Sequence, residues 1–561
     1  MDDSKPPSLS EEEQSQVVDD DHPRGLFTGL RTVSLLTLLS RVLGMIRDIG
    51  MATLFGNGPI MDSFSVAFKL PNLARRLLGE GALSTAFLPT YIRELEQNGR
   101  DDSWKLVTAV LFWLMIFCFL VVAFGEGFLV LMSGVAAPNS ESQLLFWLAG
   151  LLLPYLILIC LAAQINATLH ALNHFSIPAL LPTVLNLFWM VGIWLIAPFF
   201  SDAQTKITVI CLSILMGGVV QLLLPFLKLL QLGYRPRMQW QSGFEQVQTI
   251  AVIMAPIVVG LSITQLNTLI DSLLAWGMAK PEGISAASSD TSLPFWQIFE
   301  SGTASALYFG QRMYQFPLGV FGVALGTVLY PRLSRHAERK NEDLLRQDLT
   351  LGLQLVLGVG LPASLGLYLM AEPLSLLLFQ YGDFDVHDAF QTAEMIRYYG
   401  VGVFAFMAVL ILNRGFYAIG DTRTPVRIGV LIVVVNLLLN LLFIWWLKGK
   451  GLALATSLAA MIQSGLSIWL IREKIGSLDF SKIMRTCLRA GLATIIMAIV
   501  IIAELQIISP ATQFFYRLLR VFIPVSSAVV VYLLLVRLLG IQEILTLLGA
   551  GKNSVEHHPK S

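Results

Sequence analysis

The chain has 561 residues, of which 55% are hydrophobic and 14% are charged, and its mean hydropathy is +0.69. Soluble domains usually carry about 25% charged residues, so this composition excludes an ordinary soluble protein and indicates a membrane protein. The 38 basic and 38 acidic side chains cancel, so net charge gives no reason to expect a nucleic-acid partner. The 4 cysteines lie at irregular spacing inside apolar runs, which argues against a disulfide framework or a zinc site.

The segment 1–25 is polar and acidic, with runs of acids at Glu11 to Glu13 and Asp19 to Asp21. It lacks the basic start and the short apolar stretch of a signal peptide. We therefore predict a disordered cytoplasmic tail at 1–25. A second short cytoplasmic tail is predicted at 541–561.

Beyond the first tail, apolar runs long enough to cross a bilayer recur as far as residue 539. A spanning helix needs about 20 mostly apolar residues. This criterion predicts about 14 spans, and therefore an all-α polytopic membrane protein. The clear runs, in chain order, are 106–131, 144–169, 178–199, 207–230, 250–276, 351–377, 401–417, 426–446, 452–471, 490–508 and 522–539. Three further runs carry charges within them: 30–55, 62–92 and 304–330.

Basic residues predict the orientation of these spans. The connections at 93–105, 228–237, 332–346, 423–427 and 472–485 are rich in Lys and Arg, whereas the connections at 56–59 and 133–142 carry none. Cytoplasmic loops retain Lys and Arg, so alternate connections are assigned to the cytoplasm. Both termini are therefore predicted to be cytoplasmic in a multi-pass protein.

Two pairs of segments indicate an internal repeat. GALSTAFLPTYIR at 81–93 aligns with VALGTVLYPRLSR at 323–335, and ATLHALNHFSIP at 167–178 aligns with RGFYAIGDTRTP at 414–425. The two offsets, 323 − 81 = 242 and 425 − 178 = 247, agree in order and spacing. We predict two pseudo-symmetric six-helix lobes of parallel topology, at 26–232 and 244–474, with a transport site between them. A C-terminal helix pair at 482–540 lies outside the repeat.

Several charges fall inside the predicted spans. Arg41, Arg47 and Asp48 lie in the first span, Asp62 and Arg75 are among the charges of the second, and Arg312 lies in the eighth. A charge at the bilayer centre costs about 2.5–3.5 kcal/mol on insertion scales, so these side chains are expected to face a water-filled cavity or each other. A surplus of arginine in apolar surroundings suits a phosphate, which the guanidinium can bind with two hydrogen bonds. The alternative is a structural ion-pair network in which Asp48, Asp62 and Glu80 neutralise the arginines.

Four segments resemble the MurJ/MviN family of lipid II flippases: SRVLGMIRD at 40–48, MDSFSVAFKLPNLARRLLGEGALSTAFLP at 61–89, FPLGVFGVALGTVLYPRLSR at 316–335 and GFYAIGDTRTPVRIG at 415–429. The resemblance extends from about 30 to 539. It implies membership of the multidrug/oligosaccharidyl-lipid/polysaccharide exporter superfamily, with 14 helices in two lobes including a C-terminal pair. It also implies a bacterial inner (plasma) membrane protein that moves an undecaprenyl-pyrophosphate-linked peptidoglycan precursor outward by alternating access.

The resemblance assigns roles to particular residues. Arg41, Arg47, Arg75 and Arg312 match the cavity arginines of the family, and Asp62 matches its cavity aspartate. Arg47, Arg75 and Arg312 are expected to hold the pyrophosphate. Asp62 is expected to act in gating, or to pair with an arginine when the cavity is empty. The helix pair near 490–539 is expected to form a groove for the polyprenyl tail.

A sodium site is a further implication of the resemblance. Asp271 in the seventh span, Asn436 and Asn440 in the eleventh and Thr456 in the twelfth would supply oxygen ligands of the kind that hard cations prefer. The alternative is that these polar residues only form hydrogen bonds between helices. We expect no other cofactor; Na⁺ or the membrane potential would drive transport.

Other functions stay open. A flippase for another polyprenyl-linked oligosaccharide shares the anionic carrier, whereas a cation-coupled multidrug exporter of the same superfamily is expected to favour acids and aromatic residues in its cavity. No paired-carboxylate, phosphatase-like or nucleotide-binding motif is present in the sequence, so we do not expect an enzyme. The expected partners are the lipid-linked precursor, membrane lipids and, by resemblance, the peptidoglycan synthesis or division machinery.

Overall fold

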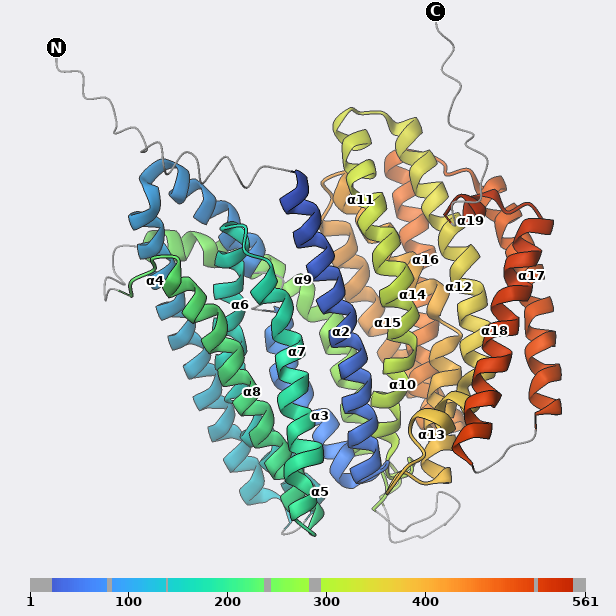
Figure 1. Cartoon of the computed structure of the whole chain (residues 1–561), viewed down its shortest axis with the longest axis horizontal. Helices are drawn as coiled ribbons and strands as arrows, with labels where there is room; N and C mark the ends of the chain where they lie inside the picture. Colours follow the sequence, from blue (N-terminus) through green and yellow to red (C-terminus); the bar gives the residue numbers. More distant parts are fainter. Residues whose placement is uncertain are drawn as a thin grey trace, which may run out of the picture. The chain divides into compact units, whose positions relative to one another are not determined.

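The computed structural model describes residues 23–77, 83–137, 140–236, 244–281, 294–508 and 513–547, and these residues are helical apart from short connections and one isolated bridge between Ala279 and Phe299 (Figure 1). The predicted all-α class is confirmed. Most of the two predicted tails, and residues 282–293, lie outside the described residues.

The helices follow the predicted apolar runs. The first half of the chain forms α2 (Pro23–Phe55), α3 (Pro59–Ala74), α4 (Leu83–Val135), α5 (Glu141–Leu152), α6 (Tyr155–Ala171), α7 (Ser176–Val191) and α8 (Ala203–Gln231). The second half forms α9 (Phe244–Gly277), α10 (Thr303–Pro317), a π-helical turn (Leu318–Gly322), α11 (Val323–Glu338), α12 (Glu342–Leu378), α13 (Val386–Gly400), α14 (Val403–Ala418), α15 (Arg423–Leu447), α16 (Gly449–Ile475), α17 (Phe480–Ile507), α18 (Phe514–Leu538) and α19 (Gln542–Leu547).

Length and composition support most of the predicted spans. Among the described residues, 10 helical segments are long and apolar enough to cross a membrane, or 11 if α13 and α14, which are bent by 45° at 401–402, form one span. The predicted spans at α2, α3 and α9 are not among them. The chain is therefore a multi-pass membrane protein, and the count of 14 stays a prediction.

The second predicted span, at 62–92, differs from the structure. Helix α3 ends at Ala74 and continues as one π-helical turn to residue 77, and a new helix, α4, begins at Leu83. Pro71 lies inside α3 and removes a backbone hydrogen bond there. Helix α4 is itself interrupted at Gly99, whose φ of 81° and ψ of −175° are not helical. Pro71 in this run predicts a bent or broken helix, and the residues between the two helices, 78–82, lie outside the described residues.

The described chain packs into two compact units that interleave along the sequence. Unit 1 comprises Met1–Gly50, Pro71–Val135 and Trp147–Val258; unit 2 comprises Met51–Leu70, Ala136–Phe146 and Val259–Ser561. The chain thus passes from unit 1 to unit 2 inside α2 and returns inside α3. The predicted lobes at 26–232 and 244–474 were continuous segments, and their boundaries stay a prediction.

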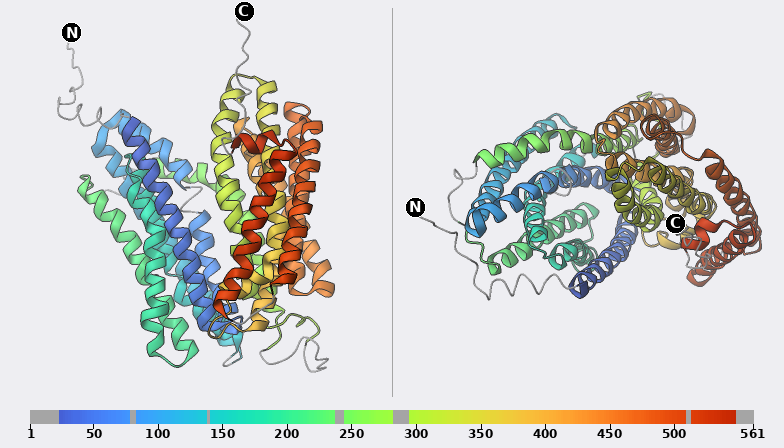
Figure 2. Two further views of the ribbon diagram at one scale, coloured as in Figure 1. Left: turned by 45° about the vertical axis from the view of Figure 1, so that its right-hand side comes forward. Right: turned by 90° about the horizontal axis from the view of Figure 1, so that it is seen from above.

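Each unit has its own packing. In unit 1, α6 and α8 pack together, and a buried polar chain ties them to α7: the Tyr155 hydroxyl donates to Gln221 Oε1 at 2.9 Å, and Gln221 Nε2 donates to the Leu181 carbonyl at 2.8 Å. Such hydrogen bonds between helices replace the hydrophobic driving force that is absent within lipid. In unit 2, α12 packs against α11, α13, α14 and α17, and α17 and α18 lie side by side (Figures 1 and 2).

Candidate functional site

Arg47 is held within unit 1 by its neighbours on α2 and α7. Its Nε and Nη2 donate to Asp48 Oδ1 at 3.0 and 2.7 Å, and its Nη1 donates to Asn186 Oδ1 at 2.9 Å. The guanidinium lies 4.1 Å from the centre of the Trp189 ring. Only 7% of Arg47 is exposed. This arginine is therefore neutralised by Asp48 and oriented by a flat aromatic surface, an arrangement that fits the ion-pair alternative in this conformation.

The other arginines of unit 1 lie in different surroundings. Arg41 is exposed, one and a half turns before Arg47 on α2. Arg75 lies in the π-helical turn that follows α3, and its Nε donates to Asn72 Oδ1 at 3.0 Å. The predicted anion-binding residues Arg41, Arg47 and Arg75 thus belong to unit 1, whereas Asp62 and Arg312 belong to unit 2.

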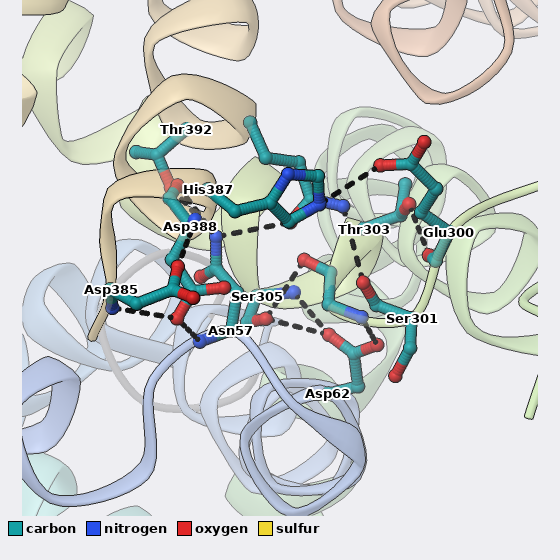
Figure 3. Close-up of polar contacts among 12 residues, drawn as sticks. Asn57, Asp62, Glu300, Ser301, Thr303, Ser305, Asp385, His387, Asp388 and Thr392 are labelled. Atoms are coloured by element: carbon teal, nitrogen blue, oxygen red, sulfur yellow. Dashed lines mark hydrogen bonds and ion pairs between the residues drawn. The ribbon is translucent and has the colours of Figure 1, made fainter. Parts of the chain in front are cut away.

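Asp62 stabilises the first turn of α10. Its carboxylate accepts hydrogen bonds from the Gly302 N–H at 2.8 Å, the Ser305 N–H at 2.6 Å and the Ser305 hydroxyl at 2.7 Å (Figure 3). Asp62 is 2% exposed, and backbone N–H groups at the start of a helix are suitable partners for a buried carboxylate. We had expected Asp62 to pair with an arginine in an empty cavity; its hydrogen bonds in the described chain go to α10 instead.

The loop between α2 and α3 is bound to α13 through Asn57, a residue that the sequence analysis did not select. The Asn57 N–H donates to Asp388 Oδ2 at 3.0 Å, and its side-chain amide donates to the Asp388 carbonyl, Gln391 Oε1 and Thr392 Oγ1 at 3.0–3.1 Å (Figure 3). We call the contacts of Asn57 and Asp62 with α10 and α13 the loop clamp. The Asn-Gly pair at 57–58 signals a turn, but nothing in the sequence signals its partners.

Gly302 allows the loop clamp to close. Its φ of 86° lies in the left-handed region, and a Cβ there would lie 2.4 Å from the Asn57 carbonyl oxygen. Left-handed backbone costs a residue with a side chain about 1–2 kcal/mol, before any collision. We expect Gly302→Ala to lower the melting temperature and Gly366→Ala to leave it unchanged, because Gly366 is helical and nothing lies within 4 Å of its Cβ position. Equal melting temperatures of the two purified variants would contradict this account.

Arg312 lies on the same helix, seven residues after Ser305. Its Nη2 donates to the Tyr308 hydroxyl at 2.9 Å, its guanidinium lies 4.8 Å from the centre of the Tyr308 ring, and its Nη1 is 3.5 Å from Gln315 Oε1. Its Nε is buried and has no hydrogen-bond acceptor in the described chain. These contacts are with uncharged groups, and the guanidinium keeps its positive charge at every physiological pH.

The predicted sodium ligands come together in unit 2 from three helices. Asp271 of α9 accepts hydrogen bonds from the Asn440 side-chain amide at 2.6 Å and from the Thr456 hydroxyl at 2.9 Å. The side-chain amides of Asn436 and Asn440 are 2.9 Å apart. Lys69 lies beside this cluster, with its ammonium group bonded to Ser272 and its charge acting on Asp271. The predicted cluster therefore exists as a set of contacts, and its occupancy by a cation is a separate question.

The chemistry of this cluster fits a monovalent cation. Asp271, Asn436 and Asn440 are at most 1% exposed, and Asn440 Oδ1 is buried with no hydrogen-bond donor in the described chain. One carboxylate, amide oxygens and a hydroxyl are hard oxygen donors with a single negative charge. In the described residues no group of three or more His, Cys, Asp and Glu side chains could hold a metal ion, so a site for a transition metal is not indicated there.

The C-terminal helix pair packs on α12 through an apolar core. Met370 of α12, Met497 and Ile501 of α17, and Val521 and Tyr532 of α18 are among the buried residues. Leucine, isoleucine, valine and phenylalanine side chains elsewhere on α17 and α18 are exposed, as is normal for surfaces in contact with lipid. The groove for a polyprenyl tail stays a prediction.

Comparison with known proteins identifies relatives of this chain and its fold. A family model described as "Lipid II flippase MurJ" matches residues 51–523, a range that includes Asp62, Arg75, Arg312 and the Asp271 cluster. The chain is 30% identical over 530 residues to the probable lipid II flippase MurJ of Buchnera aphidicola subsp. Acyrthosiphon pisum, covering 92% of this chain and 98% of that protein. It is 33% identical over 449 residues to the probable lipid II flippase MurJ of Vibrio cholerae serotype O1, covering 77% and 80%. A solved structure of "Lipid II flippase MurJ, inward closed conformation" matches with a TM-score of 0.73 and 22% identity, covering 90% of this chain and 97% of that one, and shows the same fold.

Proposed function

We propose that this chain, which belongs to the lipid II flippase MurJ family, carries a polyprenyl-pyrophosphate-linked peptidoglycan precursor from the cytoplasmic to the outer leaflet of the bacterial inner membrane. The observation that carries the proposal is the family match across 51–523. Charged arginines within apolar helices support it independently, because they suit an anionic headgroup and disfavour a cationic drug.

The arginines would bind the pyrophosphate of the cargo. An arginine fork matches two phosphate oxygens, and its charge persists at every physiological pH. One charge pair at about 4 Å gains roughly 4 kcal/mol at an effective dielectric near 20. Arg47, Arg75 and Arg312 would together offset much of the cost of removing a pyrophosphate from water. Arg47 would first have to exchange its bonds with Asp48 for bonds with the cargo.

Transport would proceed by alternating access, with both termini cytoplasmic. The loop clamp would close the outer end of the pathway, and it would have to open for the headgroup to leave. The loop clamp is made by hydrogen bonds of Asn57 and Asp62, and these bonds can be exchanged for bonds to water when the outer end of the pathway opens. The cargo's tail would stay in lipid beside α17 and α18.

Two driving forces are compatible with this proposal. Each negative charge that moves outward across about 100 mV, inside negative, gains roughly 2.3 kcal/mol. A cation bound by Asp271, Asn436, Asn440 and Thr456 would supply a second source of energy and would bias unit 2 through α9, α15 and α16. No other cofactor enters the proposal, and no residue is assigned a catalytic role.

Sodium binding by the Asp271 cluster predicts a specific thermal stabilisation. Replacing K⁺ with Na⁺ at constant ionic strength should raise the melting temperature of the purified wild type, because a ligand that binds only the folded state stabilises it. Asp271→Asn should lose this difference, because the only carboxylate of the cluster is neutralised. Asn440→Asp should enlarge it, since a second carboxylate adds negative charge. If wild type and Asp271→Asn show the same difference in melting temperature between Na⁺ and K⁺, the cluster does not bind sodium and its residues only form hydrogen bonds between helices.

The proposed cargo is tested by genetic complementation and by direct flipping. Wild-type protein is expected to restore growth to cells depleted of their own lipid II flippase, and to expose labelled lipid II at the outer leaflet. If well-expressed, membrane-inserted protein fails in both assays, lipid II is not its cargo, and another polyprenyl-linked oligosaccharide becomes the proposed cargo. Partners in peptidoglycan synthesis or division belong to this proposal as the enzymes that would consume the exposed precursor.

A further inference from the structure

Arg414 is an arginine within a membrane-spanning helix that none of the roles above uses. It lies in α14, which packs against α11, and it is partly buried. Its Nη1 donates to the Gly326 carbonyl of α11 at 2.8 Å, and its guanidinium carbon lies 5.8 Å from the centre of the Tyr330 ring. Gly326 and Tyr330 are four residues apart and so lie on the same face of α11. Two residues of one helix thus position an arginine of another.

Gly326 makes this close approach sterically possible. A Cβ at Gly326 would lie 2.6 Å from Arg414 Nε and 3.0 Å from its guanidinium carbon. Any larger residue would push the guanidinium away from the backbone of α11. The guanidinium is therefore placed by the shape of α11 and by the Gly326 carbonyl.

The charge of Arg414 has no acidic partner in the described chain. Three other basic residues at this end of unit 2 are paired with acids: Arg332 with Asp348 at 2.6 Å, Arg346 with Asp343 at 2.5 Å and Lys474 with Asp421 at 2.7 Å. Arg414 instead makes one side-chain hydrogen bond, although a guanidinium offers five N–H groups. The N–H groups that this bond leaves unused can donate to an external anion.

The position of Arg414 along the predicted transport pathway indicates which anion would bind there. From Arg312 to Gly326 the helical run continues for 14 residues, or roughly 21 Å at 1.5 Å per residue. This distance is most of the roughly 30 Å hydrocarbon core. Arg414 therefore lies far from Arg312 towards the end of α11 that carries Arg332 and Arg335, which is the predicted cytoplasmic end. An anionic headgroup that enters from the inner leaflet would reach this end of unit 2 first.

We propose that Arg414, held by Gly326 and Tyr330, is a second anion site that takes the pyrophosphate of the cargo at the inner leaflet, before Arg312 binds it. This inference rests on the proposed function. The guanidinium fork can hold two phosphate oxygens while its Nη1 stays on the Gly326 carbonyl. A bulk phospholipid also presents anionic phosphate oxygens, so the experiment must distinguish binding of the cargo from binding of a phospholipid.

The test measures binding of a short-chain polyprenyl pyrophosphate to purified protein, and retention of phosphatidylglycerol by native mass spectrometry. Arg414→Gln should bind the pyrophosphate about tenfold more weakly, a change of about 1.4 kcal/mol, with phosphatidylglycerol retention unchanged. Gly326→Ala keeps the charge but displaces it, and should weaken the same binding. Arg335→Gln is the matched control, because Arg335 is exposed on α11 and also donates to a carbonyl, that of Pro331. It should bind like the wild type.

The alternatives give different results. If Arg414 only ties α14 to α11, Arg414→Gln will melt at a lower temperature while the folded fraction binds with wild-type affinity, and the proposal is wrong. Loss of phosphatidylglycerol with unchanged pyrophosphate binding also overturns it, because the site then holds a bulk lipid. If wild-type protein itself does not bind the probe, the proposed function fails rather than this inference alone. If Arg414→Gln does not fold, the Gly326→Ala result decides.

Discussion

Replacing Arg312 with alanine is expected to abolish growth rescue in cells depleted of their lipid II flippase, at a membrane level of protein equal to wild type. Arg312 is held by Tyr308 and Gln315, which carry no charge. Its removal should cost one full interaction of the guanidinium with the pyrophosphate. A charge pair worth about 4 kcal/mol corresponds to a loss of about a thousandfold in cargo binding.

The control for this prediction is Arg335→Ala. Arg335 is exposed and lies on α11, in the same helical run, and its removal should leave rescue intact. Arg312→Lys should rescue partly, because lysine keeps the charge but not the planar fork.

Arg75→Ala is expected to resemble Arg312→Ala. Arg47→Ala should lose rescue and also melt at a lower temperature, because it leaves Asp48 buried without its arginine. Full rescue by Arg312→Ala would show that the arginine is structural.

Cross-linking the loop clamp should stop transport completely and reversibly. Asn57 and Gln391 are joined by a 3.1 Å hydrogen bond between the α2–α3 loop and α13. Cysteines at these two positions, in a background without the 4 native cysteines, should react with a short bis-methanethiosulfonate, which forms a disulfide with each thiol and releases methanesulfinate. If the loop clamp must open in each cycle, the covalent bridge will hold one state and flipping will cease. Cleaving the bridge with a reductant should restore the initial rate.

Single-cysteine variants treated with the same reagent control for modification alone, and both should keep flipping. Mass spectrometry of the peptides establishes how much protein is cross-linked. Unchanged flipping by fully cross-linked protein would mean that the contacts of Asn57 are a permanent part of unit 2. The alternating-access proposal would then need a different outer closure.

Much of the fold could be predicted because membrane insertion acts on local sequence. A run of about 20 apolar residues is stable in lipid only as a helix, since every backbone polar group must be bonded internally. The runs at 207–230 and 426–446 accordingly lie within α8 and α15. Hydropathy gives 62–92 as one run, in which Pro71 predicts a bend or break, and the described helices there are α3, which ends at Ala74, and α4, which begins at Leu83.

Part of the candidate site could also be predicted. Asp271, Asn436, Asn440 and Thr456 were chosen by resemblance, and the structure brings all of them into contact. Arg414 was missed although it interrupts the apolar run 401–417, because the sequence does not show that it packs against Gly326 of another helix. Asn57 was missed because an Asn-Gly turn is an ordinary sequence feature.

The sequence by itself determined the helical class, the multi-pass character, the charges inside apolar runs and the family, because apolar run length, the position of charges and motif spacing are properties of contiguous residues. The tertiary structure alone decided which partner each buried charge has. Arg47 pairs with its neighbour Asp48 but stacks on Trp189, while Asp62 caps a helix that begins 241 positions later, at Thr303. Such choices depend on which helices meet. A buried charge takes whichever partner packing brings within hydrogen-bond distance, and no local pattern encodes that distance.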